Sequence, residues 1–328
     1  MKIYKVKGNK EFEILDNEVF LPELVKIKIS SVILTSNDIC LYQGKINRTY
    51  PIVPGHMATA IVSEDRPEFD LKRGARVILN PYILSSAGGE GISDVKLYGL
   101  DADGFLRDFA ALPADNIIPF PEAVKEEEAL FTEAVAVALS TINAMKINKG
   151  EYVAIVGGSI VANLIGQLLL YYQAIPIYVS SEPRYLEIAK KCGIYHLIDE
   201  SRDDPYQRVM EITGGRMAEH SVIYAKAGVS PHFLFSLAGR GGDCIIVSLS
   251  SSIPRMETDI SLVSKKNLSV GGVSCGVDEI NAAVNIIAQK QLDFSHFIDK
   301  SVAFDEVIPL FEELSEHPLR YICPVVRV

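Results

Sequence analysis

Residues 151–181 read EYVAIVGGSIVANLIGQLLLYYQAIPIYVSS, and this stretch decides the fold. A β-rich run enters two glycines, an apolar helical stretch follows, and a second β-rich run ends at Ser180. This order predicts a strand, a tight turn, a helix and a parallel strand, the unit in which a helix N-terminus receives a dinucleotide pyrophosphate. Residues 152–181 carry no charge, but glycines, polar residues and a proline interrupt them. We therefore expect a buried unit of a parallel sheet and no membrane span.

The glycine pattern of this turn departs from the usual dinucleotide fingerprint, which is Gly-x-Gly-x-x-Gly or Ala. The residues that we expect to contact the cofactor here are Gly157, Gly158, Ser159, Ile160 and Val161. The first glycine fits the pattern, and so does Ala162 at its end. Ser159 adds a side chain where close backbone approach is needed, although its hydroxyl can donate to a phosphate oxygen.

The end of the second β-rich run bears on the choice of cofactor. An acidic residue normally binds the adenosine ribose there, whereas this chain has Ser180 and Ser181, followed by Glu182 and Arg184. The neutral serines with Arg184 nearby permit a 2′-phosphate, which slightly favours NADP over NAD. Glu182 argues the other way, because its charge would repel that phosphate. An alternative stays open, in which Ser180 caps the strand end and Arg184 is simply solvated.

The rest of the chain divides into two kinds of sequence. Residues 1–124 read as strands and turns, with dense glycine and proline punctuation. Beyond the glycine turn, helix and strand alternate: Glu182–Cys192 is helical, His196–Asp199 extended and Pro205–Thr213 helical. Such alternation predicts a doubly wound parallel sheet. A chain of 328 residues that is 48% hydrophobic has room for two domains.

Composition excludes several classes of partner. The formal net charge is −10 and no basic cluster occurs, so we expect no nucleic acid or anionic membrane as a partner. Five scattered cysteines without a Cys-x-x-Cys pair argue against a cysteine-rich zinc lobe and for free thiols in a reducing compartment. The start MKIYKVK is charged and strand-like, so we expect no signal peptide and a cytoplasmic protein.

Four motifs of the chain occur together in one family. They are LTSND at 34–38, PGHM at 54–57, DGFLRDF at 103–109 and EAVAVAL at 133–139, and the glycine turn follows them. With these motifs the chain resembles the medium-chain dehydrogenase/reductase family, particularly its zinc alcohol and sorbitol-type polyol dehydrogenases. The resemblance implies a GroES-like β-rich catalytic domain over 1–124 and 287–328. It also implies a Rossmann domain over 125–286, with the substrate in the cleft between them.

The resemblance also implies a catalytic zinc, whose ligand pattern this chain departs from. The family's cysteine position is occupied by Thr35, and the Glu of its Gly-His-Glu motif by Met57. His56 and Glu133 remain, and Asp38 matches the carboxylate that orients the ligand histidine. One imidazole and one carboxylate make a poor tetrahedral site, since zinc wants three protein ligands and an open position. The structural zinc lobe aligns with the cysteine-free residues 84–99, so we expect no tightly bound zinc.

Without zinc, positioned acids and bases must handle the proton. Our candidate catalytic residues are Thr35, Asp38, His56 and Glu133, with His56 as the acid or base and Asp38 orienting it. The alternatives without a catalytic role are, for His56, a turn histidine retained from a zinc-binding ancestor and, for Glu133, a structural ion pair. Arg320 matches a pyrophosphate-contacting arginine of some relatives, or is an ordinary surface arginine.

These observations lead to one expected function and two rivals. We expect an NAD(P)-dependent oxidoreductase that moves hydride between the nicotinamide and a small alcohol, polyol or sugar-derived carbonyl. The resemblance also implies a homodimer or homotetramer, in which Leu268–Cys275 forms the paired sheet edge. The first rival is a pseudoenzyme or partner subunit that keeps the fold without turnover. The second is an adenosyl-methionine methyltransferase, disfavoured because the ribose-binding acid is missing and the upstream domain fits dehydrogenases.

Overall fold

A computed structural model describes the chain except residues 17–18, 84–94, 225–231 and 248–258. Contacts divide it into two compact units, one made of Met1–Glu133 with Ile298–Val328 and the other of Ala134–Phe297. The sequence placed the boundaries at 124/125 and 286/287. In the structure both boundaries lie later in the chain, and local contacts account for each of them. Residues 126 and 127 are tied to the sheet of the first unit by Arg327, and Asp293 is hydrogen-bonded to Gln167 of the second unit.

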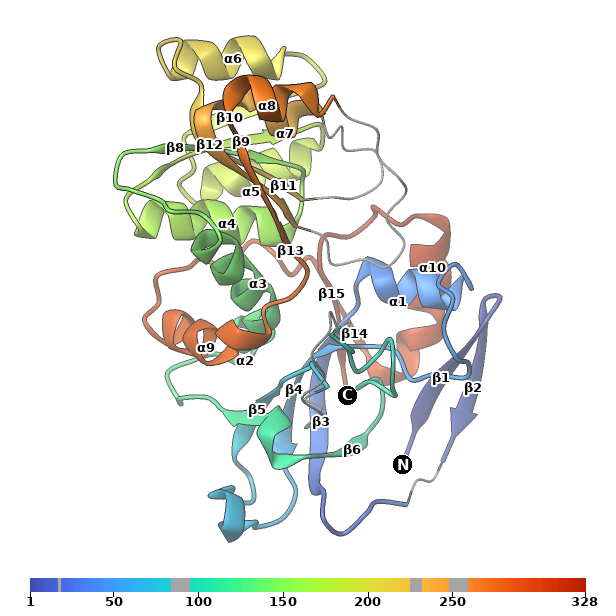
Figure 1. Cartoon of the computed structure of the whole chain (residues 1–328). Coiled ribbons are helices and arrows are strands. Elements are labelled where there is room, and N and C mark those ends of the chain that lie inside the picture. The colour runs from blue at the N-terminus through green and yellow to red at the C-terminus, as the bar shows by residue number, and fades with distance from the viewer. Residues whose placement is uncertain (17–18, 84–94, 225–231, 248–258) are drawn as a thin grey trace. The chain divides into compact units, whose positions relative to one another are not determined.

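The second unit is built on a six-stranded parallel sheet in the order β10-β9-β8-β11-β12-β13 (Figure 1). Its strands are β8 (Tyr152–Val156), β9 (Ile175–Ser180), β10 (His196–Asp199), β11 (Ala218–Tyr224), β12 (Ala238–Val247) and β13 (Ser269–Val273). Four consecutive residues of β8, from Val153 to Val156, are fully buried. Their continuous apolar run is what a strand covered on both faces requires. The α/β fold class with a doubly wound parallel sheet is therefore confirmed.

Helices alternate with these strands, as the sequence predicted. They are α3 (Thr132–Asn143), which begins in the first unit, α4 (Ile160–Tyr171), α5 (Pro183–Lys191), α6 (Pro205–Ile212), α7 (His232–Leu237), α8 (Ser261–Lys266) and α9 (Ile280–Ala288). A 3₁₀ turn, η3 (Val277–Glu279), precedes α9. Helices α4 and α5 contact β9, and α7 and α8 contact β12 (Figure 1). No helix within the described ranges is long and apolar enough to cross a membrane.

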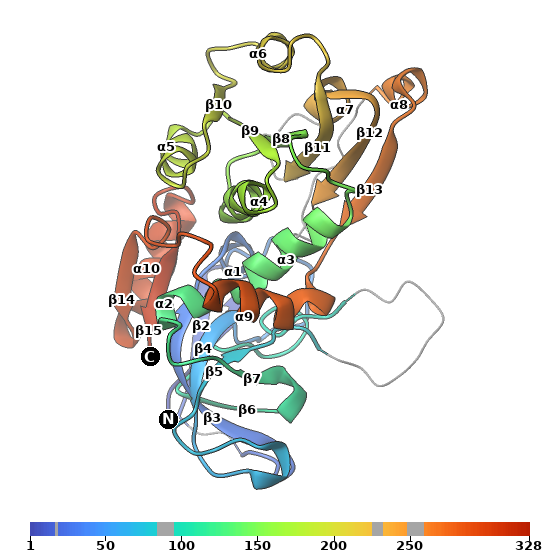
Figure 2. The same cartoon turned by 90° about the vertical axis from the view of Figure 1, so that its left-hand side faces the viewer.

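The first unit is β-rich and mostly antiparallel. A seven-stranded sheet runs β14-β15-β3-β4-β5-β7, with β6 also paired to β3, and β1 and β2 form a separate hairpin. The strands are β1 (Ile3–Gly8), β2 (Glu11–Leu15), β3 (Val25–Ile33), β4 (Met57–Val62), β5 (Arg76–Leu79), β6 (Phe109–Leu112), β7 (Ile117–Pro119), β14 (Lys300–Ala303) and β15 (Pro324–Arg327). The helical segments are α1 (Ser36–Tyr42), η1 (Pro67–Phe69), η2 (Ala114–Asn116), α2 (Glu126–Ala129), η4 (Phe304–Glu306) and α10 (Val307–Glu316). Helix α10 contacts α1 and β14 (Figure 2).

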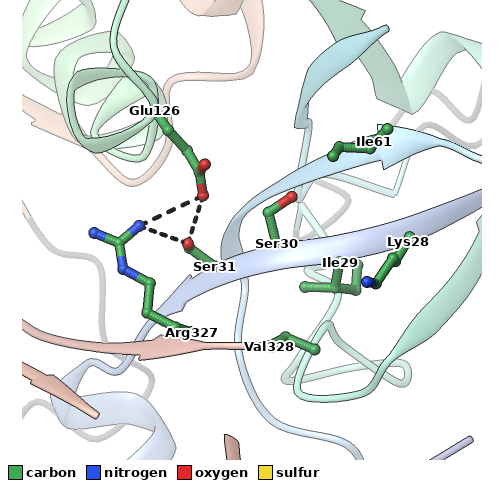
Figure 3. A pocket seen from close by; sticks show the side chains of 8 residues that line it. All are labelled: Lys28, Ile29, Ser30, Ser31, Ile61, Glu126, Arg327 and Val328. Atoms are coloured by element: carbon green, nitrogen blue, oxygen red, sulfur yellow. Dashed lines mark hydrogen bonds and ion pairs between the residues drawn. The ribbon is translucent and has the colours of Figure 1, made fainter. Parts of the chain in front are cut away.

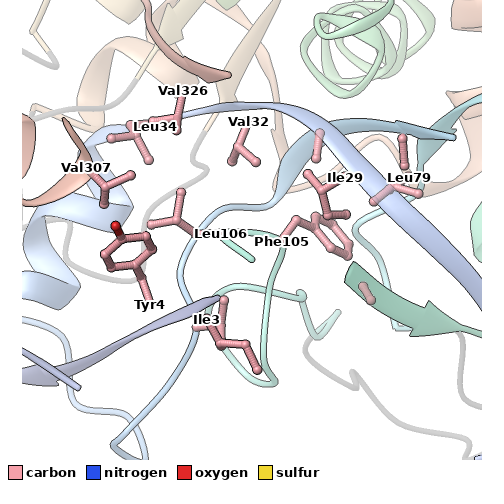
Figure 4. Close-up of a cluster of buried hydrophobic side chains, with 14 of the residues drawn as sticks. Ile3, Tyr4, Ile29, Val32, Leu34, Leu79, Phe105, Leu106, Val307 and Val326 are labelled. Carbon is pink, nitrogen blue, oxygen red and sulfur yellow. The ribbon is translucent and has the colours of Figure 1, made fainter. Parts of the chain in front are cut away.

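Strand β3 shows how the alternation of apolar and polar side chains determines which face of this sheet is buried. Val25, Ile27 and Ile29 alternate with lysines and are completely buried, as the period of two requires. The register against β4 shifts between Ile29 and Ser31, and beyond the shift the alternation ends, with Ser31, Val32 and Ile33 all buried. The apolar face packs into one core that also holds Tyr4, Phe105 and Leu106 of other segments (Figure 4).

Candidate active site

Three strand ends meet at one edge of the seven-stranded sheet. Strands β3 and β4 are antiparallel, with Ile33 opposite Met57, and β4 and β5 are antiparallel, with Thr59 opposite Ile78. In antiparallel neighbours the end of one strand lies beside the start of the next. The end of β3, the start of β4 and the end of β5 therefore lie together.

Polar side chains gather at these strand ends. Thr35 directly follows β3, His56 directly precedes β4, and Tyr82 stands three residues after β5. Asp38 of α1 and Glu133 at the start of α3 are hydrogen-bonded to this group. We call these five residues, Thr35, Asp38, His56, Tyr82 and Glu133, the strand-end cluster. It brings together all four catalytic candidates of the sequence and adds Tyr82.

Asp38 is buried, 1% exposed, and its carboxylate accepts three hydrogen bonds. Oδ2 accepts from the backbone N–H of Thr35 at 2.7 Å and from its hydroxyl at 2.8 Å, which caps helix α1. Oδ1 accepts from the N–H of Gly55 at 2.7 Å. We predicted that Asp38 orients the ring of His56. Within the described residues no hydrogen bond joins the two side chains, and Asp38 instead holds the peptide that precedes His56.

The loop before His56 is fixed by close backbone packing. Gly55 has φ +89°, and a Cβ there would lie 2.7 Å from Cγ1 of Val32, so a side chain is excluded on both counts. A Cβ on Gly104 would lie 2.3 Å from the carbonyl oxygen of Gly55, which the N–H of Phe105 reaches at 2.8 Å. The DGFLRDF motif thus supplies the glycine that lets the two loops touch.

His56 itself is held in a buried position with 7% of its surface exposed. Its Nδ1 is buried and has no hydrogen-bond partner among the residues that the structure describes. A buried ring nitrogen without a partner is uncommon, and it leaves the imidazole with hydrogen-bonding capacity that the fold does not use.

Glu133 has one side-chain hydrogen bond among the described residues. The hydroxyl of Tyr82 donates to its Oε1 at 2.9 Å. The structural ion pair that the sequence left open for Glu133 is thus replaced by a neutral partner. Sequence reasoning missed Tyr82, since it lies 51 positions from Glu133 in a loop with no periodic signal.

In the second unit, the glycine turn adopts the predicted strand–turn–helix geometry. Gly157 has φ +112°, and a Cβ on Gly158 would lie 2.6 Å from the ring of Tyr185 and 2.7 Å from Oγ of Ser180. Both positions therefore require glycine. Ser159 is the N-cap of α4, with its Oγ accepting the N–H of Ala162 at 3.0 Å. Its side chain is thus turned back onto the helix.

The other predicted cofactor residues divide into buried and exposed positions. Ser180 is buried and its Oγ accepts the N–H of Glu182 at 3.0 Å, the strand-end cap that the sequence left as an alternative. Ser181 and Arg184 are exposed. Arg320, in the first unit, forms an ion pair with Glu313 at 2.5 Å. Their contacts with a cofactor stay predictions.

A pocket of the first unit is lined by none of the strand-end cluster residues, and three of its polar side chains, Ser31, Glu126 and Arg327, bond to one another (Figure 3). The hydroxyl of Ser31 donates to Glu126, and Nη1 of Arg327 donates to Ser31 at 2.9 Å. Thr59 also donates to Glu126, at 3.0 Å, and Arg327 reaches Glu127 at 2.8 Å. This group ties α2 to β3, β4 and β15, and we assign it a structural role.

Known proteins of solved structure share this architecture. A zinc-binding dehydrogenase from Sinorhizobium meliloti, solved with NADP, superposes with a TM-score of 0.88 at 19% identity, covering 100% of this chain and 99% of that one. This likeness shows the fold. In sequence, the Alcohol dehydrogenase GroES-like domain matches residues 22–122.

Two relatives align over nearly the whole chain. A zinc-type alcohol dehydrogenase-like protein of Haemophilus influenzae is 27% identical over 310 residues, 91% of this chain and 90% of that protein. D-xylulose reductase of Saccharomyces cerevisiae is 25% identical over 332 residues, covering 93% and 91%. These matches agree with the resemblance to the medium-chain dehydrogenase/reductase family. The expected enzyme class, an oxidoreductase like the alcohol and polyol dehydrogenases of this family, is confirmed.

A zinc ion of the kind this dehydrogenase family implies does not fit the donors of the strand-end cluster. The hydroxyl of Thr35 is used on Asp38, and both oxygens of Asp38 accept backbone N–H groups. His56 and Glu133, whose Oε1 accepts from Tyr82, are then the two groups of the cluster that could bind a metal. His56 is left as the one nitrogen ligand. Among the described residues no group of three or more His, Cys, Asp or Glu side chains converges as a metal site would require. Part of the predicted zinc-lobe region, residues 84–94, lies outside the described residues.

Proposed function

We propose that this protein is an NAD(P)-dependent oxidoreductase that moves hydride between the nicotinamide and a small alcohol, polyol or sugar-derived carbonyl without a catalytic zinc. The observation that carries the proposal is the strand-end cluster, in which the buried imidazole of His56 and the carboxylate of Glu133 have no third metal ligand beside them among the described residues. The related structure bound to NADP supports a nicotinamide cofactor. The name of the Haemophilus relative, which is zinc-type, lends no support to zinc independence.

The proposed chemistry assigns one task to each side chain. When bound, the nicotinamide supplies or accepts the hydride. In alcohol oxidation the substrate hydroxyl also loses its proton, and His56 takes it as general base, returning it in the reverse direction. The Thr35 hydroxyl donates to Asp38 and holds the start of α1, so the proton of the substrate hydroxyl goes to His56 alone. Asp38 acts through the Gly55 peptide by keeping the His56 loop in place.

The glycine turn of the second unit fits a dinucleotide. Gly157 and Gly158 bring bare backbone to the N-terminus of α4, and the Ser159 side chain is turned away onto Ala162. The helix N-terminus then offers N–H groups of Ile160 and Val161 to the pyrophosphate. We slightly favour NADP over NAD as the cofactor. Ser181 and Arg184 are exposed after β9, where they could receive a 2′-phosphate, and the strand carries no acidic residue at its end.

Assembly and location complete the proposal. Strand β13 is the edge of the parallel sheet and pairs with β12, and its Val270 is 47% exposed. An edge strand with exposed backbone groups and an apolar side chain favours pairing with a second copy. We propose a homodimer or homotetramer in the cytoplasm, with small molecules as its other partners.

Titration of the purified protein with NADH and NADPH, followed by cofactor fluorescence with and without a chelator, tests this proposal. Micromolar binding that the chelator leaves unchanged supports it, and failure to bind either cofactor overturns it. Binding without turnover on a broad alcohol and ketone panel would favour the pseudoenzyme. His56→Ala should reduce turnover at least about a hundredfold if the imidazole carries the proton.

A further inference from the structure

Three glycines of the first unit meet beside the peptide that precedes His56. Gly55 lies in the loop before β4, and Gly99 and Gly104 lie before β6. A Cβ on Gly104 would lie 2.3 Å from the carbonyl oxygen of Gly55 and 2.6 Å from Cα of Gly99. We propose that Gly99 is a positioning residue, which keeps His56 in place through its backbone contact with Gly55. This rests on the proposed function, in which His56 exchanges a proton with the substrate.

The backbone of Gly55 is bound at both of its polar atoms. Its N–H donates to Oδ1 of Asp38 at 2.7 Å, and its carbonyl oxygen accepts the N–H of Phe105 at 2.8 Å. Val32 fills the space beside its Cα, because a Cβ built there would lie 2.7 Å from Cγ1 of that valine. Gly55 therefore has little room to shift without losing a hydrogen bond or meeting Val32.

Gly99 packs against Gly55 backbone to backbone. A Cβ on Gly99 would lie 2.9 Å from the carbonyl carbon of Gly55, 3.0 Å from its oxygen and 3.2 Å from its nitrogen. These are backbone atoms, which cannot rotate away as the end of a flexible side chain would. Gly99 also has φ +84°, and its N–H donates to the carbonyl oxygen of Ala102 at 2.7 Å. A larger residue at position 99 must therefore push the Gly55 peptide out of place.

The segment that follows Gly99 is also tied to the loop before His56. The N–H of Gly104 donates to the carbonyl oxygen of Val53 at 2.7 Å, and the N–H of Val53 donates to Oδ1 of Asp103 at 2.9 Å. The imidazole adds little to this support, since Nδ1 of His56 has no hydrogen-bond partner among the described residues. The position of the ring therefore depends on the backbone before it, and a displacement at Gly99 reaches His56.

The experiment compares Gly99→Ala with Gly74→Ala. Gly74 has the same φ of +84° but no atom within 4 Å of a Cβ built on it, so the control carries the backbone strain without the contact. Its N–H bonds to the carbonyl oxygen of Val62, at the end of β4 away from His56. In protein with isotope-labelled histidine, the ring resonance of His56 is assigned by its loss in His56→Ala. It should shift in Gly99→Ala and stay unchanged in Gly74→Ala.

Turnover on an alcohol that the protein oxidises gives a second measurement. Displacing a catalytic group by about 1 Å can cost about a hundredfold in rate. A shift of a few tenths of an ångström in Gly99→Ala should therefore lower kcat at least about tenfold, with KM within about threefold, whereas Gly74→Ala should keep kcat within about twofold of the wild type.

Gly99→Asn and Gly74→Asn form a second pair, which replaces the first if Gly99→Ala does not fold, because asparagine tolerates a positive φ better than alanine does. An unmoved His56 resonance in the Gly99 variant, or equal shifts in the Gly99 and Gly74 variants, overturns the inference. An equal loss of kcat in both variants overturns it too. Unchanged turnover in His56→Ala would instead reject the proposed role of His56, whereas the resonance tests Gly99 without substrate or cofactor.

Discussion

The backbone N–H of Gly55 donates to Oδ1 of Asp38 at 2.7 Å, and the same carboxylate caps helix α1 through Thr35. One buried carboxylate thus joins the segment after β3 to the loop before β4. It holds Thr35 and the peptide before His56 together, and among the described residues it makes no hydrogen bond to the imidazole. The geometry of the candidate site therefore depends on the hydrogen bonds of Asp38.

Replacing Asp38 by alanine should destabilise the protein by about 3 kcal/mol, because three buried donors lose a charged acceptor. Denaturant unfolding measures the effect. Asp305→Ala is the control, since that carboxylate is 84% exposed in its ion pair with Lys2 and should change stability by less than about 1 kcal/mol. A loss below about 1 kcal/mol for Asp38→Ala would show that water replaces the carboxylate freely.

Ser159 should matter to the helix more than to the cofactor. Ser159→Ala should cost about 1 kcal/mol of folding stability through the lost N-cap, and Ser159→Gly only a few tenths. Because the side chain is turned onto Ala162, the Kd for NADPH of Ser159→Gly should stay within about threefold of the wild type. Binding that becomes more than tenfold tighter would mean that the serine side chain obstructs the pyrophosphate.

Arg327 provides a test of the pocket assigned to structure. Its ion pairs with Glu126 at 3.6 Å and Glu127 at 2.8 Å involve side chains that are about a third to a half exposed. Such pairs contribute little, so Arg327→Met should lower stability by less than about 1 kcal/mol and leave turnover unchanged. A loss of turnover at unchanged stability would assign this pocket to the active site.

Acid should weaken the second unit through Glu151. Burial acts to raise the pKa of this carboxyl, but hydrogen bonds from Asn148 and His220 outweigh it and hold the pKa below its ordinary value of 4.5. A lowered folded-state pKa gives stability that is complete above pH 4.5 and lost as the pH falls through the folded value.

Glu151→Gln should therefore be about 1 kcal/mol less stable than the wild type at pH 6, with the difference vanishing towards pH 3. Thermal unfolding across that range measures it. Glu211→Gln, whose partner is Arg208 on the exposed surface of α6, serves as control. A difference that stays constant with pH would contradict the assignment.

The sequence predicted the parts that rest on local pattern. The apolar run of β8, the turn at Gly157 and the following helix need only neighbouring residues, and they form as expected. The gathering of Thr35, His56 and Glu133 at one place followed from the family resemblance. Their roles stay predictions.

Contacts between residues far apart in the chain could not be predicted from the sequence. Asp38 was expected to orient a histidine, whereas its bonds with Thr35 cap α1 and its bond from the N–H of Gly55 joins two loops. Tyr82 gave no signal, because only the folded sheet brings it to Glu133. Ser159 looked like an obstruction until its bond to Ala162 placed it as a helix cap.

Turnover by metal-depleted protein is the sharpest test of zinc-independent catalysis. The protein is dialysed against a strong chelator, its metal content is measured, and NAD(P)⁺-dependent oxidation of 2,3-butanediol and related alcohols is followed with and without added Zn²⁺. We predict that protein holding less than about one tenth of an equivalent of zinc turns over at the same rate as protein with added Zn²⁺. The reason is that, among the described residues, no set of three or more ligands converges at His56. Activity that disappears on depletion and returns with one equivalent of Zn²⁺ would contradict it.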